Sequence, residues 1–188
     1  GRMPSHGRAA SIIAAMRSKR ASSPRLPTSC TAIGSPSNPI STIGAYAAIQ
    51  RELGQKLHFP ATEAVWTANL NVTDVGLLSK AMIWAATEPR CAGEAFNIVN
   101  GDTFCWRDVW GRIAAHFDME PGELKPMRLR AFMADKRPVW EAIADREGLR
   151  DRDVTKIADW AFADVLFEGA WDQTATVVKA HQYGFNGM

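Results

Sequence analysis

The chain has 188 residues, of which 46% are hydrophobic and 22% charged, a composition typical of one globular domain with a sizeable core. No apolar run approaches the 18 residues that would indicate a membrane span. The three cysteines lie far apart, and neither Cys-x-x-Cys nor His-x-x-x-His occurs, so the sequence predicts no zinc site. We therefore expect a cytoplasmic protein with free, mostly buried thiols and no membrane partner.

The charge is divided unevenly along the chain. Residues 1–30 contain six basic residues and no acidic residue, whereas the other 158 residues carry 16 basic and 20 acidic groups. The larger part is thus mildly acidic and offers no basic face for a nucleic acid. Residues 1–35 are rich in Ser, Pro, Gly, Ala and Arg, and we expect a disordered or non-native basic segment there, with a targeting peptide as the alternative.

Ordered structure is expected from about Ile40. The apolar spacing predicts a helix from Ile40 to Leu53, ended by Gly54. Residues 56–60 are expected to be a short extended piece. The alternation of apolar and polar side chains from Trp66 to Val72 predicts a half-buried strand.

The middle of the chain continues with a helix, a strand and a helix. Asp74 supplies N-cap chemistry for a helix that should run to about Ala86. The apolar run Ala95–Val99 predicts a buried strand, and an amphipathic helix is expected from Trp106 to Phe117.

The last third is predicted to be helical and irregular, because the region from Pro121 to Pro126 breaks the pattern. No further strand is expected there. The expected helical pieces are Leu129–Asp135, Pro138–Arg146, Val154–Asp164 and Thr174–Tyr183.

The order of these motifs resembles a known family. From about Ile33 to Asn186 the chain is similar to the carboxy-terminal half of the progesterone 5β-reductase/iridoid synthase-like reductases, which are atypical extended short-chain dehydrogenases/reductases. The motifs that carry the resemblance include Gly44-Ala-Tyr-Ala-Ala-Ile, Val72-Thr-Asp74-Val, Leu78-Ser-Lys-Ala-Met-Ile-Trp-Ala-Ala-Thr87, Asn97-Ile-Val-Asn-Gly-Asp102, Trp106-Arg-Asp-Val-Trp110, Phe132-Met-Ala-Asp-Lys136 and Trp160-Ala-Phe-Ala-Asp164.

The resemblance implies an α/β fold, namely the C-terminal part of a Rossmann-like extended short-chain dehydrogenase. A few parallel strands would lie beside flanking helices, followed by a mostly helical substrate-side subdomain, with residues 36–188 as the substrate-binding half. It also implies NAD(P)H-dependent reduction of the C=C bond of a small α,β-unsaturated carbonyl compound, an enone. In such an enzyme a tyrosine, helped by a lysine, stabilises the developing enolate.

The chain departs from this pattern where the cofactor and the catalytic groups are concerned. No Gly-x-Gly-x-x-Gly or Gly-x-x-Gly-x-x-Gly occurs, and neither Tyr46 nor Tyr183 is followed four residues later by a lysine. We therefore expect that the front half of the enzyme is missing from this chain. NADPH would belong to the parent family, and this chain alone is expected to bind no cofactor and to be catalytically silent.

Three residues are candidates for substrate binding. Phe162 matches a family position whose aromatic ring lines the substrate pocket, and Met133 and Trp160 are its apolar neighbours by sequence pattern. Core packing is the competing explanation for all three. No catalytic or metal-binding residue is predicted.

Two other functions remain open at this point. The chain could be part of a sugar-nucleotide epimerase or dehydratase, a class that shares the Val-Thr-Asp-Val signature. It could also be a non-catalytic interaction module, whose exposed apolar surface would favour self-association.

Overall fold

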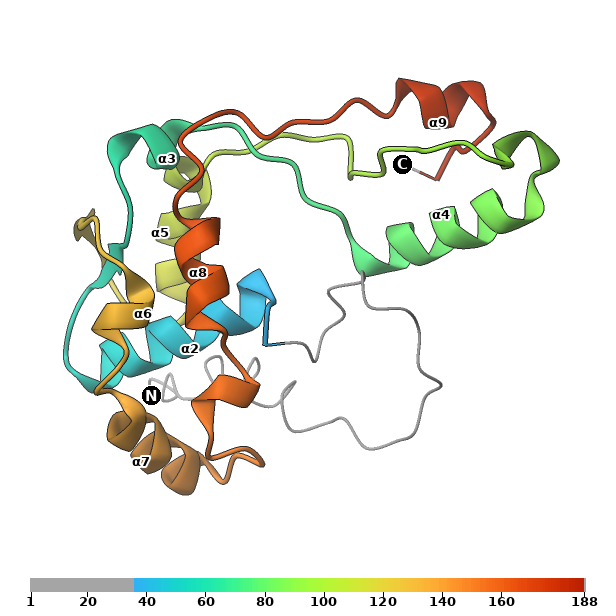
Figure 1. Ribbon diagram of the computed structural model, residues 1–188. Helices are drawn as coiled ribbons and strands as arrows, with labels where there is room; N and C mark the ends of the chain where they lie inside the picture. Colours follow the sequence, from blue (N-terminus) through green and yellow to red (C-terminus); the bar gives the residue numbers. More distant parts are fainter. Residues whose placement is uncertain (1–35, 188) are drawn as a thin grey trace, which may run out of the picture.

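The computed structural model describes residues 36–187, and the expectation for residues 1–35 lies outside the described part. Figure 1 shows a body that holds most of the helices and an arm that extends away from it. Among the described residues, no helix has the length and apolar character needed to cross a bilayer.

The body contains a parallel pair of short strands, β1 (Leu57–Phe59) and β2 (Pro121–Leu124). The Leu57 N–H donates to the Glu120 carbonyl at 2.9 Å, and the Lys125 N–H donates to the Phe59 carbonyl at 2.8 Å. The expectation that no strand follows residue 117 was therefore wrong, because an edge strand tolerates prolines that would end a helix.

Gly122 explains why this strand pair can form at a turn-like sequence. A Cβ atom at this position would lie 2.6 Å from Nδ1 of His58, which is inside the contact distance of real side chains. A side chain at position 122 would therefore require the His58 ring to move.

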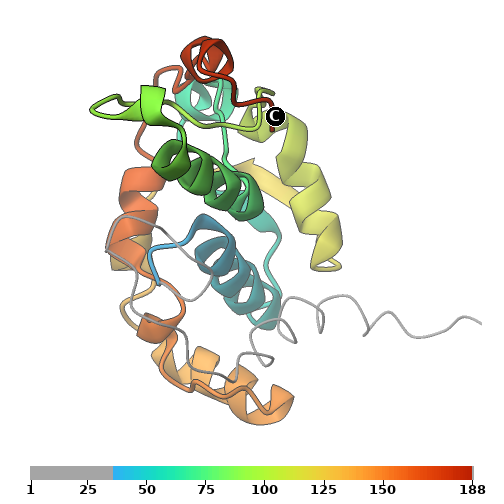
Figure 2. The ribbon, with the colours of Figure 1, turned by 90° about the vertical axis from the view of Figure 1, so that its right-hand side faces the viewer.

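The helix α3 (Glu63–Thr67) and five further helices surround this strand pair. They are α2 (Pro39–Glu52), α5 (Trp106–His116), α6 (Leu129–Phe132), α7 (Arg137–Glu147) and α8 (Trp160–Leu166). Figure 2 shows α2 lying between α5 and α8. The helices expected at 40–53, 106–117 and 138–146 are thus confirmed.

Helix ends account for the remaining differences in the body. Gly54 and Gly148 both have positive φ, +67° and +59°, and end α2 and α7 as glycines in left-handed conformations do. The single helix expected over 154–164 was wrong, because Asp159 caps a new helix. The chain forms a 3₁₀ turn at Val154–Lys156 and then α8.

The aromatic ring of Phe59 lies at the centre of the body's core. Its centroid is 4.8 Å from that of Trp66, 5.0 Å from that of Trp110 and 5.4 Å from that of Phe167, each in an edge-on geometry. Trp110 is fully buried, and its Nε1–H donates to the Leu57 carbonyl at 2.9 Å. One strand residue therefore joins α3, α5 and the end of α8.

The arm is built from α4 (Val75–Thr87), a 3₁₀ turn (Pro89–Cys91) and α9 (Val178–Gln182). The Asp74 carboxylate caps α4 by accepting from the Leu77 N–H at 3.0 Å, as the sequence predicted. The helix expected over 174–183 is confined to the five residues of α9.

Both strands expected near the arm were wrong. Trp66 lies in α3, and Leu70 forms only isolated bridges, antiparallel to Phe104 and parallel to Gln173. Residues 95–99 run extended without forming a strand. A strand forms when a neighbouring strand pairs with it along its length. The described residues supply only single backbone hydrogen bonds here, such as that from the Asn100 N–H to the Val72 carbonyl at 2.9 Å.

We predict that Trp110→Phe lowers the free energy of unfolding by about 2–3 kcal/mol, because it leaves a void in the core and removes the hydrogen bond from the indole N–H to the Leu57 carbonyl. Urea unfolding followed by circular dichroism measures the change. The matched control is Trp171→Phe, since the Trp171 side chain is 66% exposed and its loss should cost less than about 0.5 kcal/mol. Equal losses in the two variants would contradict the central place of Trp110.

Candidate substrate-side site

The three candidate residues lie on two helices that pack against each other, α6 and α8. Met133 follows α6 directly and is buried in the main core, where it is 4% exposed. Trp160 begins α8 and packs half-buried against the same core. Phe162 is half-buried and, among the described residues, belongs to neither hydrophobic cluster. Phe162 is therefore the member of the set that the core does not account for.

The start of α8 is fixed by Asp159. Its Oδ1 accepts from the backbone N–H groups of Ala161 and Phe162 at 3.0 and 3.1 Å, and its Oδ2 accepts from the Ser37 hydroxyl at 3.0 Å. These bonds, that from the Phe162 N–H above all, hold the pKa of the Asp159 carboxyl below its usual value. The Asp159 N–H also donates to the Pro36 carbonyl at 2.9 Å. The residue thus sets the backbone of Phe162 and anchors the segment that leads into α2.

An ion pair joins the start of α6 to the end of α8. The Arg128 guanidinium donates to both oxygens of Glu168, at 3.2 and 2.9 Å. Between these ends, the Arg130 N–H donates to Oδ1 of Asp164 at 3.3 Å. The ion pair is exposed, so it contributes to orientation more than to stability.

An open cleft of about 460 Å³ lies elsewhere, between α2 and α5, and the sequence reasoning did not find it. Its lining is mostly apolar, with Arg112 and His116 as the polar members. Nε2 of His116 is buried and has no hydrogen-bond partner. In the sequence, the four-residue spacings Val109–Ile113 and Arg112–His116 on α5 could have indicated that these side chains share one face of the helix. The lining residues are Ile40, Ile43, Val109, Arg112, Ile113, His116 and Phe117.

The Tyr46 hydroxyl is engaged within the core, and the Tyr183 ring lies beside Lys179. The Tyr46 hydroxyl donates to the His58 carbonyl and accepts from Nε2 of Gln50, both at 2.9 Å. Burial raises the pKa of Tyr46 to about 12. Lys179 lies over the ring of Tyr183 at 5.9 Å, and its ammonium donates to a carboxylate oxygen of Glu94 at 2.6 Å.

The two cysteines among the described residues are Cys91 and Cys105. Cys91 and Cys105 are free and buried, and the Cys105 thiol donates to Oδ2 of Asp108 at 3.0 Å. Cys30 lies outside the described residues. Within residues 36–187, no group of three His, Cys, Asp or Glu side chains is arranged to hold a metal ion.

The amino-terminal end of α4 does not fit the pyrophosphate of a dinucleotide. It is the described helix that follows an extended segment and carries a glycine in its first turn, Gly76. The Asp74 carboxylate already accepts from the Leu77 N–H there, and its negative charge opposes a phosphate. The described residues therefore provide no cradle for a nicotinamide dinucleotide at this helix.

Comparison with known proteins places this fold in a family. Residues 38–173 match the PRISE-like Rossmann-fold domain. The chain is 40% identical over 155 residues to an (S)-8-oxocitronellyl enol synthase of Camptotheca acuminata and 36% identical over 155 residues to one of Nepeta racemosa. It is 33% identical over 154 residues to the 3-oxo-Δ4,5-steroid 5β-reductase of Arabidopsis thaliana. The chain belongs to the PRISE-like Rossmann-fold family.

These matches confirm both the resemblance found in the sequence and the α/β fold class. Each match covers 80% of this chain but only 39–40% of the relative. The chain thus spans about two fifths of the length of the curated relatives it matches. The substrate-binding roles of Phe162, Met133 and Trp160 stay predictions.

We predict that Asp159→Ala lowers the free energy of unfolding at neutral pH by about 1–2 kcal/mol, through loss of the α8 cap. Because the folded-state pKa lies below the unfolded value of about 3.9, this stabilisation is present above that pH and is lost as pH falls through the folded-state pKa. The gap between wild type and variant should therefore shrink on acidification, as measured by urea unfolding at several pH values.

The control is Asp135→Ala, which removes an exposed carboxylate whose ion-pair partner is the neighbouring Lys136. Its effect should stay within about 0.5 kcal/mol. A loss in Asp159→Ala no larger than this, or one that grows as the pH falls below 4, would contradict the capping role.

Proposed function

We propose that this chain is the substrate-binding part, residues 36–188, of an NAD(P)H-dependent reductase that acts on the C=C bond of a small α,β-unsaturated carbonyl compound. The observation that carries the proposal is the similarity to both an enol synthase and a 3-oxo-Δ4,5-steroid 5β-reductase. Hydride addition to the β-carbon of an enone moves an electron pair onto the carbonyl oxygen as an enolate. Protonation on oxygen then yields an enol, and protonation on carbon yields the saturated ketone, so one addition step accounts for both names.

The helix pair α6–α8 is the part of this chain that suits such a substrate. Phe162 is half-buried outside the core cluster, Trp160 begins the same helix, and Met133 lies inside the core directly after α6. We propose these residues as one wall of the pocket. The nicotinamide cofactor, NADPH in this proposal, would supply the hydride when bound by the rest of the enzyme.

Two alternatives are ranked below this proposal. Reduction is favoured over sugar-nucleotide epimerisation because the relatives named above are a steroid reductase and enol synthases. A non-catalytic interaction module is favoured by one observation, the exposed apolar side chains of α4, which include Ile83 at 66% and Val75 at 46% exposed. Such a face favours association, including self-association.

We predict that the purified 188-residue chain shows no NADPH oxidation with a 3-oxo-Δ4,5-steroid or an unsaturated dialdehyde. The start of α4 does not fit a pyrophosphate, the Tyr46 hydroxyl is engaged by His58 and Gln50, and the sequence has no tyrosine followed four residues later by a lysine. The assay is the loss of NADPH absorbance, with the Camptotheca relative as positive control. Measurable turnover by this chain would contradict the assignment of a substrate-side part alone.

A chimaera tests the proposed role directly. It joins the part of the Camptotheca relative that lies outside the match to residues 36–188 of this chain, and we expect it to reduce an enone. Phe162→Ala in this chimaera should raise KM about tenfold while kcat changes less, which corresponds to about 1.4 kcal/mol of lost substrate contact.

The matched control for that variant is Val165→Ala on the same helix, since the Val165 side chain is 68% exposed. It should leave KM unchanged. A soluble chimaera that binds NADPH but reduces no enone would count against the proposed reaction, and turnover of a nucleotide sugar would support the epimerase alternative.

A further inference from the structure

One carboxylate joins the start of α8 to the segment that leads into α2. Asp159 accepts from the Phe162 N–H through Oδ1, at 3.1 Å, and from the Ser37 hydroxyl through Oδ2, at 3.0 Å. Its own N–H donates to the Pro36 carbonyl at 2.9 Å. Figure 1 shows the segment before α2 passing beside the start of α8. Both oxygens of this carboxylate are therefore engaged by donors of the protein itself.

The same segment is fixed on its other side to α2. The Asn38 side chain caps this helix by accepting from a backbone N–H of the first turn at 2.8 Å. The Thr42 hydroxyl donates to the Pro36 carbonyl at 3.3 Å, and Thr42 is fully buried. All residues of α2 from 42 to 50 are buried. The segment therefore links the start of α8 to a helix that the core surrounds.

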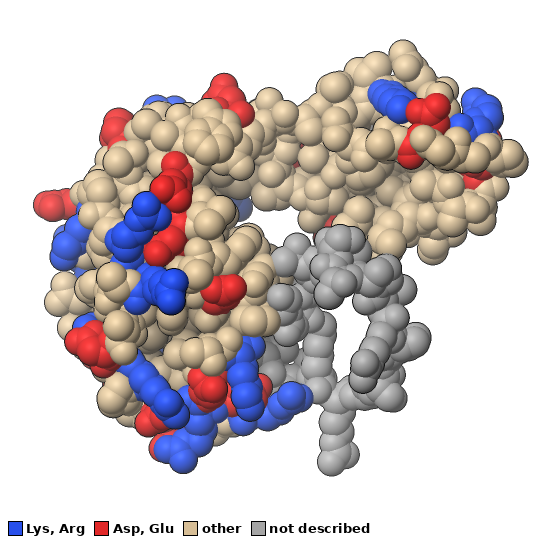
Figure 3. Space-filling view, in the orientation of Figure 1, with Lys and Arg blue, Asp and Glu red and all other residues tan. Residues whose placement is uncertain are grey.

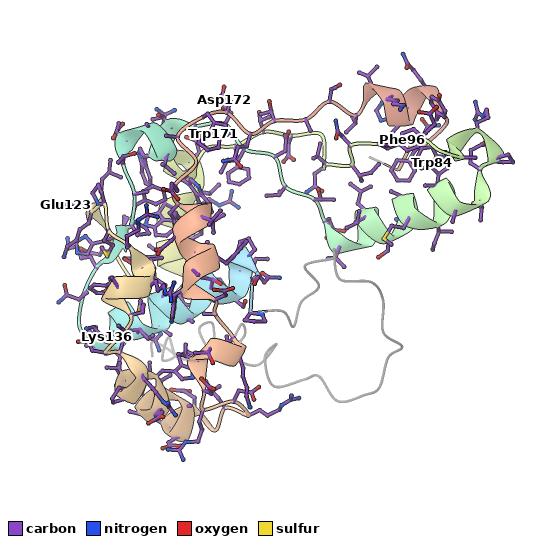
Figure 4. The ribbon with its side chains drawn as sticks, viewed as in Figure 1. Trp84, Phe96, Glu123, Lys136, Trp171 and Asp172 are labelled. Atoms are coloured by element: carbon purple, nitrogen blue, oxygen red, sulfur yellow. The ribbon has the colours of Figure 1, made fainter. Side chains whose placement is uncertain are left out.

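The two ends of α8 are held by different means. Figure 4 shows the chain leaving the far end of α8 toward Trp171 and Asp172, on the side of the body opposite to α7. At that end Phe167 packs into the aromatic core. The start of the helix, which is nearer to Phe162, is held by the polar bonds of Asp159.

The Phe162 ring depends on this backbone support. Among the described residues, Phe162 belongs to neither hydrophobic cluster. In a helix, χ1 of an aromatic side chain is restricted to two staggered wells, so the backbone largely sets the direction of the ring. Figure 3 shows a mostly uncharged surface over α8, and Asp164 is the one charged residue among the seven of this helix. The ring thus belongs to a surface region that suits an apolar compound.

We propose that Asp159 is a positioning residue of the pocket wall and sets the direction of the Phe162 ring through its bonds to the helix start and to Ser37. It acts through Phe162 and not by touching the ligand, because its two oxygens are already bonded. This inference rests on the proposed function, in which Phe162 contacts the enone. If Asp159 were only a helix cap, its loss would have no special link to Phe162 or Ser37.

The first test follows the ring itself in the 188-residue chain. The chain is labelled with 4-fluorophenylalanine, and Phe162→Leu identifies the fluorine resonance of position 162. We expect Ser37→Ala and Asp159→Ala to shift or broaden this resonance. Asp159→Asn should keep it, because an asparagine amide accepts from the Phe162 N–H and donates to the Ser37 hydroxyl.

Asp153→Ala is the matched control. Asp153 caps the 3₁₀ turn that precedes α8 by accepting from the Thr155 N–H at 3.0 Å. Its loss removes the same type of cap and leaves the bonds at Ser37 and Phe162 in place, so the resonance should not change. An unchanged resonance in both Ser37→Ala and Asp159→Ala overturns the inference. If Asp159→Ala does not fold, Ser37→Ala decides the question, because it keeps the cap.

The second test is a double-mutant cycle in the chimaera described above. We expect Phe162→Ala to raise KM about tenfold and Asp159→Ala about fivefold, while kcat changes less. If Asp159 acts through Phe162, the double variant should also show an increase of about tenfold, whereas independent effects would multiply to about fiftyfold. Asp153→Ala should leave KM unchanged.

The outcomes separate this inference from the proposed function. A fluorine resonance that responds as expected, together with a chimaera that binds NADPH but reduces no enone, supports the positioning and counts against the reaction. In an active chimaera, an increase of about fiftyfold in the double variant overturns the inference, because the two residues then act independently. So does a KM that Asp153→Ala raises as much as Asp159→Ala does, since the loss of any cap is then sufficient.

Discussion

The aromatic packing around Phe59 is the contact on which the body depends. Phe59 is the last residue of the short strand β1, and its ring contacts side chains from α3, α5 and the end of α8. Trp110 adds a directional constraint, because its indole N–H donates to the carbonyl of Leu57, which lies two residues before Phe59 on β1. These contacts hold the strand and the helices in one arrangement. The position of α8 follows from the contact between Phe59 and Phe167 at its end.

The position of the candidate substrate side chains follows from this core. The end of α8 is fixed by Phe167 against Phe59, and its beginning by the Asp159 cap. Phe162 lies between these two points and does not join the core. The proposed role of α8 as a wall for an apolar ligand depends on this one aromatic side chain outside the packing.

The arm is held together by a much smaller hydrophobic cluster than the body. Its cluster is small, with four buried residues, and it is connected to the body through extended segments that pair only at single bridges. Its helix keeps an apolar face and its extended segment keeps free backbone donors. Of these two features, the exposed apolar face is the costly one in water, because exposed backbone donors can bond to water.

By itself the sequence determined four of the described helices and the family of the chain. Hydrogen bonds in a helix are local, so apolar spacing and caps such as Asp74 sufficed for α2, α4, α5 and α7, and ordered motifs sufficed for the PRISE-like assignment. Only the tertiary structure decided the strands. Among the described residues, no strand pairs with the apolar run 95–99. In contrast, β2 forms in a proline-containing segment because β1 lies beside it. It also decided that Met133 belongs to the core and Phe162 does not, since burial depends on residues distant in sequence.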